Sequence, residues 1–294
     1  VVGAGFGGAG QGQARIYRRS GETWSLEQTI DSTGPSGQHG ATFAEYLDYD
    51  GTTLVIGAHQ EYVDGTQDAG ATYFYQFNGS QWAEVSRVVS TDVYWNGYFG
   101  SSVAVHGNFA AVASNDNFNN RGIVELLKWN GDDWTIVETL LPPDGVADDA
   151  FGQSVALVGN QLLINQSLAT VNGIEDAGCA WLYELNADGT ANEPERIISP
   201  TPHMNEEFGR VIDLSSDGVF IGGGRPMDGM LTIARFSWDP AVGITLTHRY
   251  DSMEPNVEDD FMPARSIGTD GQTLMVGLTG DGQGVVQAYY AADD

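Results

Sequence analysis

Apolar residues gather along the chain in short runs, and each run is bounded by Gly, Asn or Asp. The runs are rich in Val, Ile, Tyr, Phe and Trp, as in TTLVIGA, GIVELLKW and GCAWLYEL. Such residues favour β-strands, and a Gly-Asn pair between two runs predicts a tight hairpin turn. No long segment has a helical period of apolar residues, so the sequence predicts an all-β fold.

The runs recur in the same order, and a Phe opens each repeat. The spacings between successive Phe residues are 56, 52, 57 and 53, for Phe43, Phe99, Phe151, Phe208 and Phe261. Within each repeat a Gly-containing turn follows the first run, and up to three further runs come after it. Four strands in about fifty residues are typical of one blade of a β-propeller.

The repeats divide the chain into blades of a single β-propeller domain over residues 1–294. We expect a partial blade at 1–38, a partial blade at 261–294 and four complete blades between them, at 39–98, 99–150, 151–207 and 208–260. The first partial blade lacks its first strand and the last lacks its fourth, which gives 22 strands. Six blades are expected, with seven as the alternative. Because the chain begins inside the pattern, we expect a mature or trimmed product.

Two phrases carry a family resemblance. FGSSVAVHGN (99–108) and FGQSVALVGN (151–160), together with VIGA and GATYFYQFNGSQW, resemble the FG-GAP repeats of secreted bacterial proteins and, more distantly, the propeller of integrin α chains. The resemblance implies a β-propeller with an extracellular binding or adhesion role, and it implies no reaction. Integrin blades carry a calcium loop after the first strand, whereas only Asp48 and Asp50 offer even two carboxylates here, so we do not carry that site over.

The charge of the chain excludes some partners. Acidic residues outnumber basic ones 40 to 12, and the net charge is −28. Nucleic acids and anionic membranes attract Lys and Arg, so neither is an expected partner, and no apolar run is long enough for membrane insertion. An acidic shell supports solubility, and cation binding is the alternative interpretation. The single cysteine, Cys179, is expected in the core.

Long, irregular segments join the second strand of a blade to the third, and each blade to the next. In a propeller both kinds of loop lie on one face, and binding residues concentrate on such loops. Aromatic rings beside carboxylates suit sugars or a protein hot spot. The candidate ligand-binding residues are Tyr62, Tyr94, Trp95, Tyr98, Asp116 and Phe118. The alternative is that these are ordinary loop tips or pack onto the neighbouring blade.

Several acidic residues recur in register and are candidate metal ligands: Asp64, Asp68, Asp148, Asp149 and Asp176. Recurrence is also expected where the same position faces water in every blade, so both interpretations stay open. No cofactor is required, and calcium is the one candidate cation. The histidines lack zinc-site spacing, and the GFGGAG segment near the start has no helix after it to bind a dinucleotide.

We expect a secreted or cell-surface module that is not an enzyme and that binds a glycan or an extracellular protein through its long loops. One alternative is a structural subunit of an extracellular assembly, which would self-associate through the open edges of its terminal blades. The other is a hydrolase or lyase acting on polysaccharide, which would place acids with perturbed pKa values in a central cleft.

Overall fold

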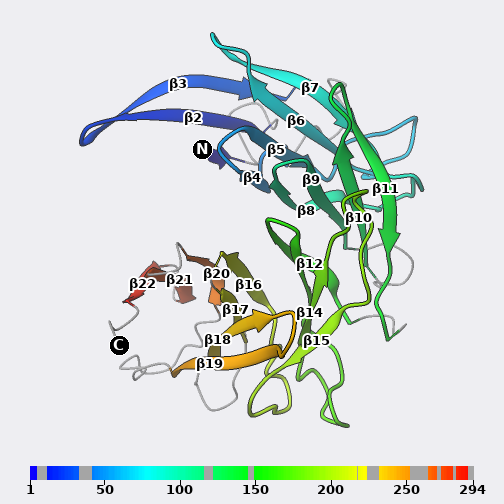
Figure 1. The fold of residues 1–294 in the computed structure, drawn as a ribbon. Helices are drawn as coiled ribbons and strands as arrows, with labels where there is room; N and C mark the ends of the chain where they lie inside the picture. The colour runs from blue at the N-terminus through cyan, green and yellow to red at the C-terminus, as the bar shows by residue number, and fades with distance from the viewer. Residues whose placement is uncertain are drawn as a thin grey trace. The chain divides into compact units, whose positions relative to one another are not determined.

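The computed structural model describes residues 1–4, 12–32, 42–115, 122–144, 149–216, 218–223, 232–251, 264–269, 273–280 and 283–290. This part of the chain forms 22 strands and no helix. The strands lie in six antiparallel sheets, and strands that follow one another in the sequence are neighbours in each sheet (Figure 1). The expectation of an all-β propeller with four-stranded blades is confirmed. The number of blades and the domain boundaries stay predictions.

Contacts divide the chain into two compact units, of which the first comprises Val1–Leu141 and Asn186–Thr190. This unit holds three sheets (Figure 1). One consists of β1 (Val2–Ala4), β2 (Gln13–Ser20) and β3 (Thr23–Asp31). The next consists of β4 (Leu47–Tyr49), β5 (Thr53–Ala58), β6 (Ala71–Phe77) and β7 (Trp82–Val88). The third consists of β8 (Phe99–His106), β9 (Phe109–Ser114), β10 (Ile123–Trp129) and β11 (Trp134–Leu140).

The second unit comprises Pro142–Leu185 and Ala191–Asp294 and also holds three sheets. Its first sheet consists of β12 (Phe151–Val158), β13 (Gln161–Gln166), β14 (Cys179–Glu184) and β15 (Glu195–Ile198). The next consists of β16 (Val211–Ser215), β17 (Gly218–Gly222), β18 (Thr232–Asp239) and β19 (Gly243–Asp251). The last consists of β20 (Ala264–Thr269), β21 (Thr273–Gly280) and β22 (Gln283–Tyr290).

The repeated Phe residues belong to the core. The side chains of Phe43, Phe99, Phe151 and Phe208 are at most 1% exposed, and Phe261 lies outside the described residues. Large apolar side chains with little exposure contribute about 1.5–3 kcal/mol each to folding. The FG-containing phrases therefore specify the packing between blades.

Tryptophans that follow the outer hairpins fill the spaces between sheets of the first unit. Trp134 is 2% exposed and stacks on Phe74 of the preceding sheet, with ring centroids 4.6 Å apart. Trp82 is 8% exposed, and its backbone N–H donates a hydrogen bond to Gln28 Oε1 of the first sheet at 2.7 Å. Trp24, on the first sheet, is 65% exposed. A large ring after the hairpin thus fastens a blade to the one before it.

Two loops with related sequences, DGTQDAG (64–70) and NGIEDAG (172–178), hold the chain that enters the next blade. In the first unit, Tyr98 N donates to Asp68 O at 2.9 Å and Phe99 N to Ala69 O at 3.0 Å. In the second unit, Glu207 N donates to Asp176 O and Phe208 N to Ala177 O, each at 2.9 Å. The repeated sequence therefore encodes one backbone arrangement, which fixes where each blade begins.

Gly178 is the last residue of the second of these loops. A substitution there measures how closely this loop approaches the segment at Phe208. A Cβ atom at Gly178 would lie 2.5 Å from Phe208 N, whereas one at Gly173 would meet nothing within 4 Å, although both residues have positive φ. We expect Gly178→Ala to lower the free energy of unfolding by about 3 kcal/mol or more. Gly173→Ala should cost only about 1 kcal/mol from its backbone conformation.

Urea unfolding followed by circular dichroism measures both variants. Equal losses at Gly178 and Gly173 would show that the close approach of the two segments does not limit the side chain at residue 178.

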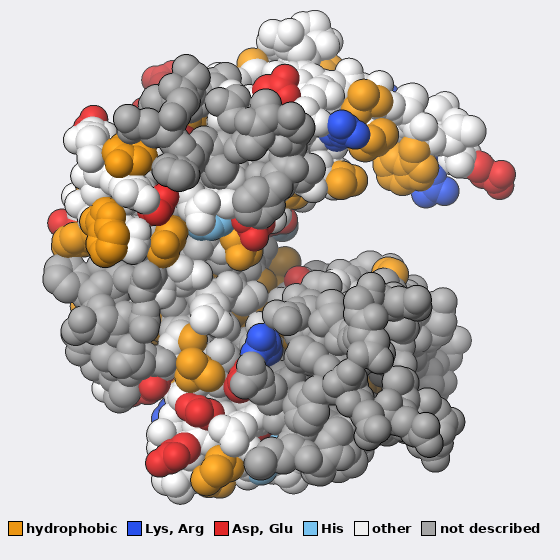
Figure 2. All heavy atoms as spheres, turned by 180° about the vertical axis from the view of Figure 1, so that it is seen from behind, with side chains coloured by type: hydrophobic (Ala, Val, Ile, Leu, Met, Phe, Trp, Pro, Cys, Tyr) orange, Lys and Arg blue, Asp and Glu red, His pale blue; other side chains and the backbone are white. Residues whose placement is uncertain are grey.

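Acidic side chains outnumber basic ones on the described surface shown in Figure 2, as the composition requires. In the described part of the chain no helix has the length and apolar character of a membrane span.

Candidate functional site

The aromatic residues selected from the sequence lie mostly in the first unit. Trp95 is 69% exposed on the segment between β7 and β8, while Tyr62, Tyr94 and Tyr98 are half-buried. Tyr98 packs edge-on against His59, with ring centroids 5.8 Å apart. Asp116 and Phe118 lie outside the described residues. The ligand-binding role of these residues stays a prediction.

The candidate metal ligands differ in their exposure, and cation binding by them stays a prediction. Asp64 is exposed, Asp68 and Asp176 are half-buried, Asp149 is buried, and Asp148 lies outside the described residues. Where the structure describes the chain, no group of three or more His, Cys, Asp or Glu side chains is placed to share a metal ion.

The acidic turn DYDG has a structural role. Asp48 Oδ2 accepts a hydrogen bond from Val105 N at 2.8 Å, and Asp50 Oδ2 accepts one from Gly107 N at 2.7 Å. Both carboxylates thus satisfy backbone amides in the next sheet, at the end of β8 and in the turn after it. Across the same turn β4 and β5 pair as antiparallel neighbours, so the turn closes a hairpin.

Asp149 belongs to a partly buried polar cluster in the second unit. The cluster, called the Asp149 cluster below, comprises Asp144, Asp149, Gln166, Trp181 and Arg196. Gln166 is fully buried, and its Nε2 donates to Asp144 Oδ1 at 2.9 Å and to Asp149 Oδ2 at 3.2 Å. Trp181 Nε1 donates to Gln166 Oε1 at 2.6 Å, which fixes the orientation of the amide.

The strand register of one blade assembles this cluster. Gln166 is the last residue of β13 and pairs with Phe151 of β12 and with Cys179 of β14. Asp149 lies two residues before Phe151, so it reaches the same end of the sheet. On the outer strands, Trp181 pairs with Arg196. All the side chains therefore meet at the edge where β13 ends and β14 begins.

The cluster makes the Asp149 carboxyl unusually basic. Burial raises the pKa of Asp149 to about 6, and the nearby charge of Asp144 adds to this rise, while the Gln166 hydrogen bond and Arg196 oppose it. A carboxyl group with a pKa near neutrality can both accept and donate a proton under physiological conditions. Perturbed acids of this kind concentrate at functional sites.

Arg196 places a cation at the open side of the cluster. Its guanidinium lies over the Trp181 ring, 5.2 Å from the centroid, and its Nη2 lies 3.8 Å from Asp144 Oδ2. The Arg196 side chain is 33% exposed and that of Asp144 is 23% exposed, whereas Asp149 is only 9% exposed. A small molecule reaching Arg196 would therefore approach a partly desolvated acid.

The acid two positions before the repeated Phe is buried in two blades. Glu206 occupies the position before Phe208 that Asp149 occupies before Phe151, and it is 2% exposed. Burial raises its pKa, and its Oε1 accepts a hydrogen bond from Ser199 Oγ at 2.6 Å. In these two blades the acid at this position is thus buried, and its pKa is raised.

Another titratable group with a perturbed pKa lies in the first unit. Burial lowers the pKa of His59 to about 4, so the imidazole is neutral at physiological pH. Its Nδ1 atom is buried and has no hydrogen-bond partner among the described residues. Tyr46 and Tyr98 pack edge-on against the ring. Within the described ranges no comparable acid–base network surrounds His59, so the Asp149 cluster is the stronger candidate.

Sequence reasoning missed Asp144, Gln166 and Arg196. One signal lay in the outer strands, where an arginine faces an aromatic residue of the third strand in two blades, as the pairs Tyr73–Arg87 and Trp181–Arg196. In the first unit Arg87 joins Tyr73 in binding the buried Glu61. An arginine that recurs in register beside an aromatic residue therefore indicates a buried carboxylate nearby.

The raised pKa of Asp149 predicts a pH-dependent contribution to stability. The folded protein holds the proton more tightly than the unfolded chain, in which an Asp has a pKa of about 4. The stabilisation from this group is therefore complete below about pH 4 and is lost as the pH rises through about 6. Relative to Asp149→Asn, the wild type should lose up to about 2 kcal/mol between pH 4 and 7.

Urea unfolding of both proteins at the two pH values measures this difference. Asp132→Asn, at an exposed hairpin turn, is the matched control and should follow the wild type at both pH values. Parallel behaviour of the wild type and Asp149→Asn would contradict the raised pKa.

Comparison with known proteins supports the fold and part of the sequence resemblance. The sequence model of the FG-GAP repeat matches residues 134–183, which span β11 to most of β14. No curated protein sequence matches the chain. The resemblance to FG-GAP repeats is confirmed, and the matched segment includes Gln166 and Trp181 of the Asp149 cluster.

Many solved structures share the fold, and two of them illustrate the similarity. One is a periplasmic gluconolactonase of Pseudomonas aeruginosa, with 18% identity, a TM-score of 0.58, and coverage of 92% of this chain and 74% of that one. The other is a protein from Lactobacillus plantarum, with 15% identity, a TM-score of 0.54, and coverage of 95% and 81%.

The expectation of an adhesion module without enzymatic activity is wrong. The propeller fold of this chain is shared with an enzyme, the gluconolactonase, and neither solved structure is named as an adhesion protein. The error arose because the repeated phrases that carry the FG-GAP resemblance are packing elements. They specify the scaffold and do not indicate which reaction or ligand the loops on it support.

Proposed function

We propose that the protein is a hydrolase that acts on a carbohydrate or a carbohydrate-derived ester such as a sugar lactone, with Asp149 as its general base. The observation that carries the proposal is the buried Asp149 carboxyl, whose pKa is raised to about 6 beside Asp144, Gln166 and Arg196. The gluconolactonase with the same fold supports the choice of a sugar lactone.

The cluster offers each group that ester hydrolysis needs. The Asp149 carboxylate accepts a proton from a water molecule while the water oxygen attacks the carbonyl carbon. The guanidinium of Arg196 donates hydrogen bonds to the carbonyl oxygen as it becomes negative. The bond from the carbonyl carbon to the ring oxygen then breaks, and Asp149 returns the proton to the alkoxide. The step consumes one water molecule and requires no cofactor.

The Gln166 side chain serves as a positioning residue. Its side-chain nitrogen donates hydrogen bonds to both Asp144 and Asp149, and its side-chain oxygen accepts one from the Trp181 indole. The negative charge of Asp144 beside Asp149 favours the protonated form of Asp149 and so raises its pKa. The same pair of acids also suits glycoside cleavage, in which one carboxyl donates a proton while the other carboxylate assists water.

A neutral substrate and a location outside the cytoplasm fit the proposal. The chain carries a net charge of −28, which repels polyanionic substrates. The periplasmic neighbour and the FG-GAP match support an extracellular or periplasmic location.

A hydrolysis assay with glucono-δ-lactone in a pH-stat, corrected for spontaneous opening, tests the proposal. We expect the wild type to accelerate opening, with kcat/KM rising as the pH increases through about 6. Asp149→Asn should lower kcat about a hundredfold or more. Arg196→Gln should lower kcat by about a hundredfold, because it removes the donor to the carbonyl oxygen.

Asp132→Asn is the matched control and should behave as the wild type. A second arm presents neutral polysaccharides and measures released reducing ends. Failure to hydrolyse any lactone or polysaccharide, or full activity of Asp149→Asn on a substrate that the wild type cleaves, would contradict the proposal.

A further inference from the structure

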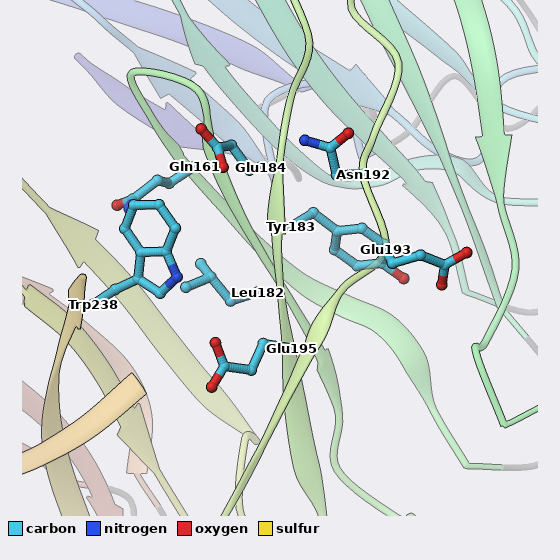
Figure 3. A pocket seen from close by; sticks show the side chains of 8 residues that line it. All are labelled: Gln161, Leu182, Tyr183, Glu184, Asn192, Glu193, Glu195 and Trp238. Carbon is cyan, nitrogen blue, oxygen red and sulfur yellow. The ribbon is translucent and has the colours of Figure 1, made fainter. Parts of the chain in front are cut away.

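A groove lies between the first two sheets of the second unit, and none of the residues that line it belongs to the Asp149 cluster. Its volume is about 110 Å³, and it is lined by Gln161, Leu182, Tyr183, Glu184, Asn192, Glu193, Glu195 and Trp238. Figure 3 shows the Trp238 indole, from β18, beside Leu182 of β14. The lining residues Leu182 and Glu195 adjoin Trp181 and Arg196 along the strands, but their side chains face the groove, so the groove is a site separate from the proposed hydrolase site.

The strand register explains why an aromatic ring and carboxylates meet in this groove. Leu182 and Glu184 project from the same face of β14, because alternate residues of a strand share a face. Leu182 pairs with Glu195 of β15, and Gln161 of β13 pairs with Glu184, so both partners border the same groove. Figure 3 shows Gln161 and Glu184 toward one end of the indole and Glu195 toward the other.

Leu182 gives the groove an apolar base. Leu182 is 4% exposed and packs in the same hydrophobic cluster as Trp238 and Ile244. The indole itself is half-buried and so keeps part of its surface open. A ligand in this groove would therefore contact the exposed part of the indole ring and the methyl groups of Leu182.

The carboxylates of the groove are held by neutral groups. Glu184 Oε1 accepts a hydrogen bond from Asn160 Nδ2 at 3.1 Å, and Glu195 Oε1 accepts one from Ile244 N at 3.0 Å. Both bonds fix the side chains without cancelling their charge. None of the described residues that line the groove is Lys, Arg or His. The groove thus concentrates negative charge beside an aromatic ring.

We propose that this groove binds an organic ammonium group. The face of a tryptophan ring attracts a cation, and the attraction increases where the ligand is partly desolvated. Carboxylates on either side add a longer-range attraction, and Leu182 accommodates the alkyl groups that surround the nitrogen. A metal ion fits less well, because it prefers several converging oxygen ligands, and the described residues hold no such group.

Titration with choline and with its neutral isostere 3,3-dimethyl-1-butanol tests the proposal on the whole chain. Tryptophan fluorescence and calorimetry report binding. We expect saturable binding of choline that is about tenfold or more tighter than that of the isostere, since only choline carries the charge. Trp238→Leu should weaken choline binding about tenfold, and Trp238→Phe should retain part of the affinity.

Glu184→Gln keeps the shape of the groove and removes one charge, so it should weaken choline binding about threefold to tenfold. Glu175→Gln removes a charge of the same unit that does not line the groove, and it is the matched control. The circular dichroism spectrum of each variant shows whether it has folded.

Three results would overturn the proposal. They are equal affinity for choline and its isostere, unchanged choline affinity in folded Glu184→Gln, and absence of saturable choline binding to the folded wild type. Competition by a neutral sugar such as glucose at equal concentration would likewise show that the groove recognises hydroxyl groups and not an ammonium group.

Discussion

The structure depends on a close backbone contact between blades. In this contact a Gly at the end of a loop of one blade lies against the segment that enters the next blade. At Gly178 a Cβ atom would lie 2.5 Å from Phe208 N, and at Gly70 one would lie 2.5 Å from Phe99 N. Only a residue without a side chain permits this contact. The adjacent hydrogen bonds, from Tyr98 N to Asp68 O and from Glu207 N to Asp176 O, then set where each first strand starts. The register of every later contact depends on that starting point.

The Asp149 cluster depends on the strand register within its own blade. Because β12 begins at Phe151 and pairs with β13 up to Gln166, the acid that precedes the strand meets the amide that ends the next one. The pairing of Trp181 with Arg196 adds a cation at the outer strand. A scaffold interaction thus determines the chemistry, since a slip of one residue would turn Gln166 to the opposite face of the sheet.

The sequence predicted the scaffold because its signals are local. The Phe residues, the Gly-containing turns and the apolar runs each determine a few neighbouring contacts, and the strands were predicted from them. Asp149 was selected from its recurrence, but as a metal ligand. Its partners could not be identified, because Gln166 and Arg196 come from separate strands and are recognisable only once the register is known. The functional expectation failed for the same reason, since it rested on phrases that pack the blades.

The proposed chemistry depends on the proton affinity of a single carboxyl group. Carbon-13 NMR of the Asp149 side-chain carboxyl, assigned by comparison with Asp149→Asn, measures that affinity directly as the pH is varied. We predict a midpoint near 6, because burial and the charge of Asp144 both favour the protonated form and so raise the pKa. A midpoint near 4, the ordinary value for an aspartate, would contradict the assignment of Asp149 as the general base.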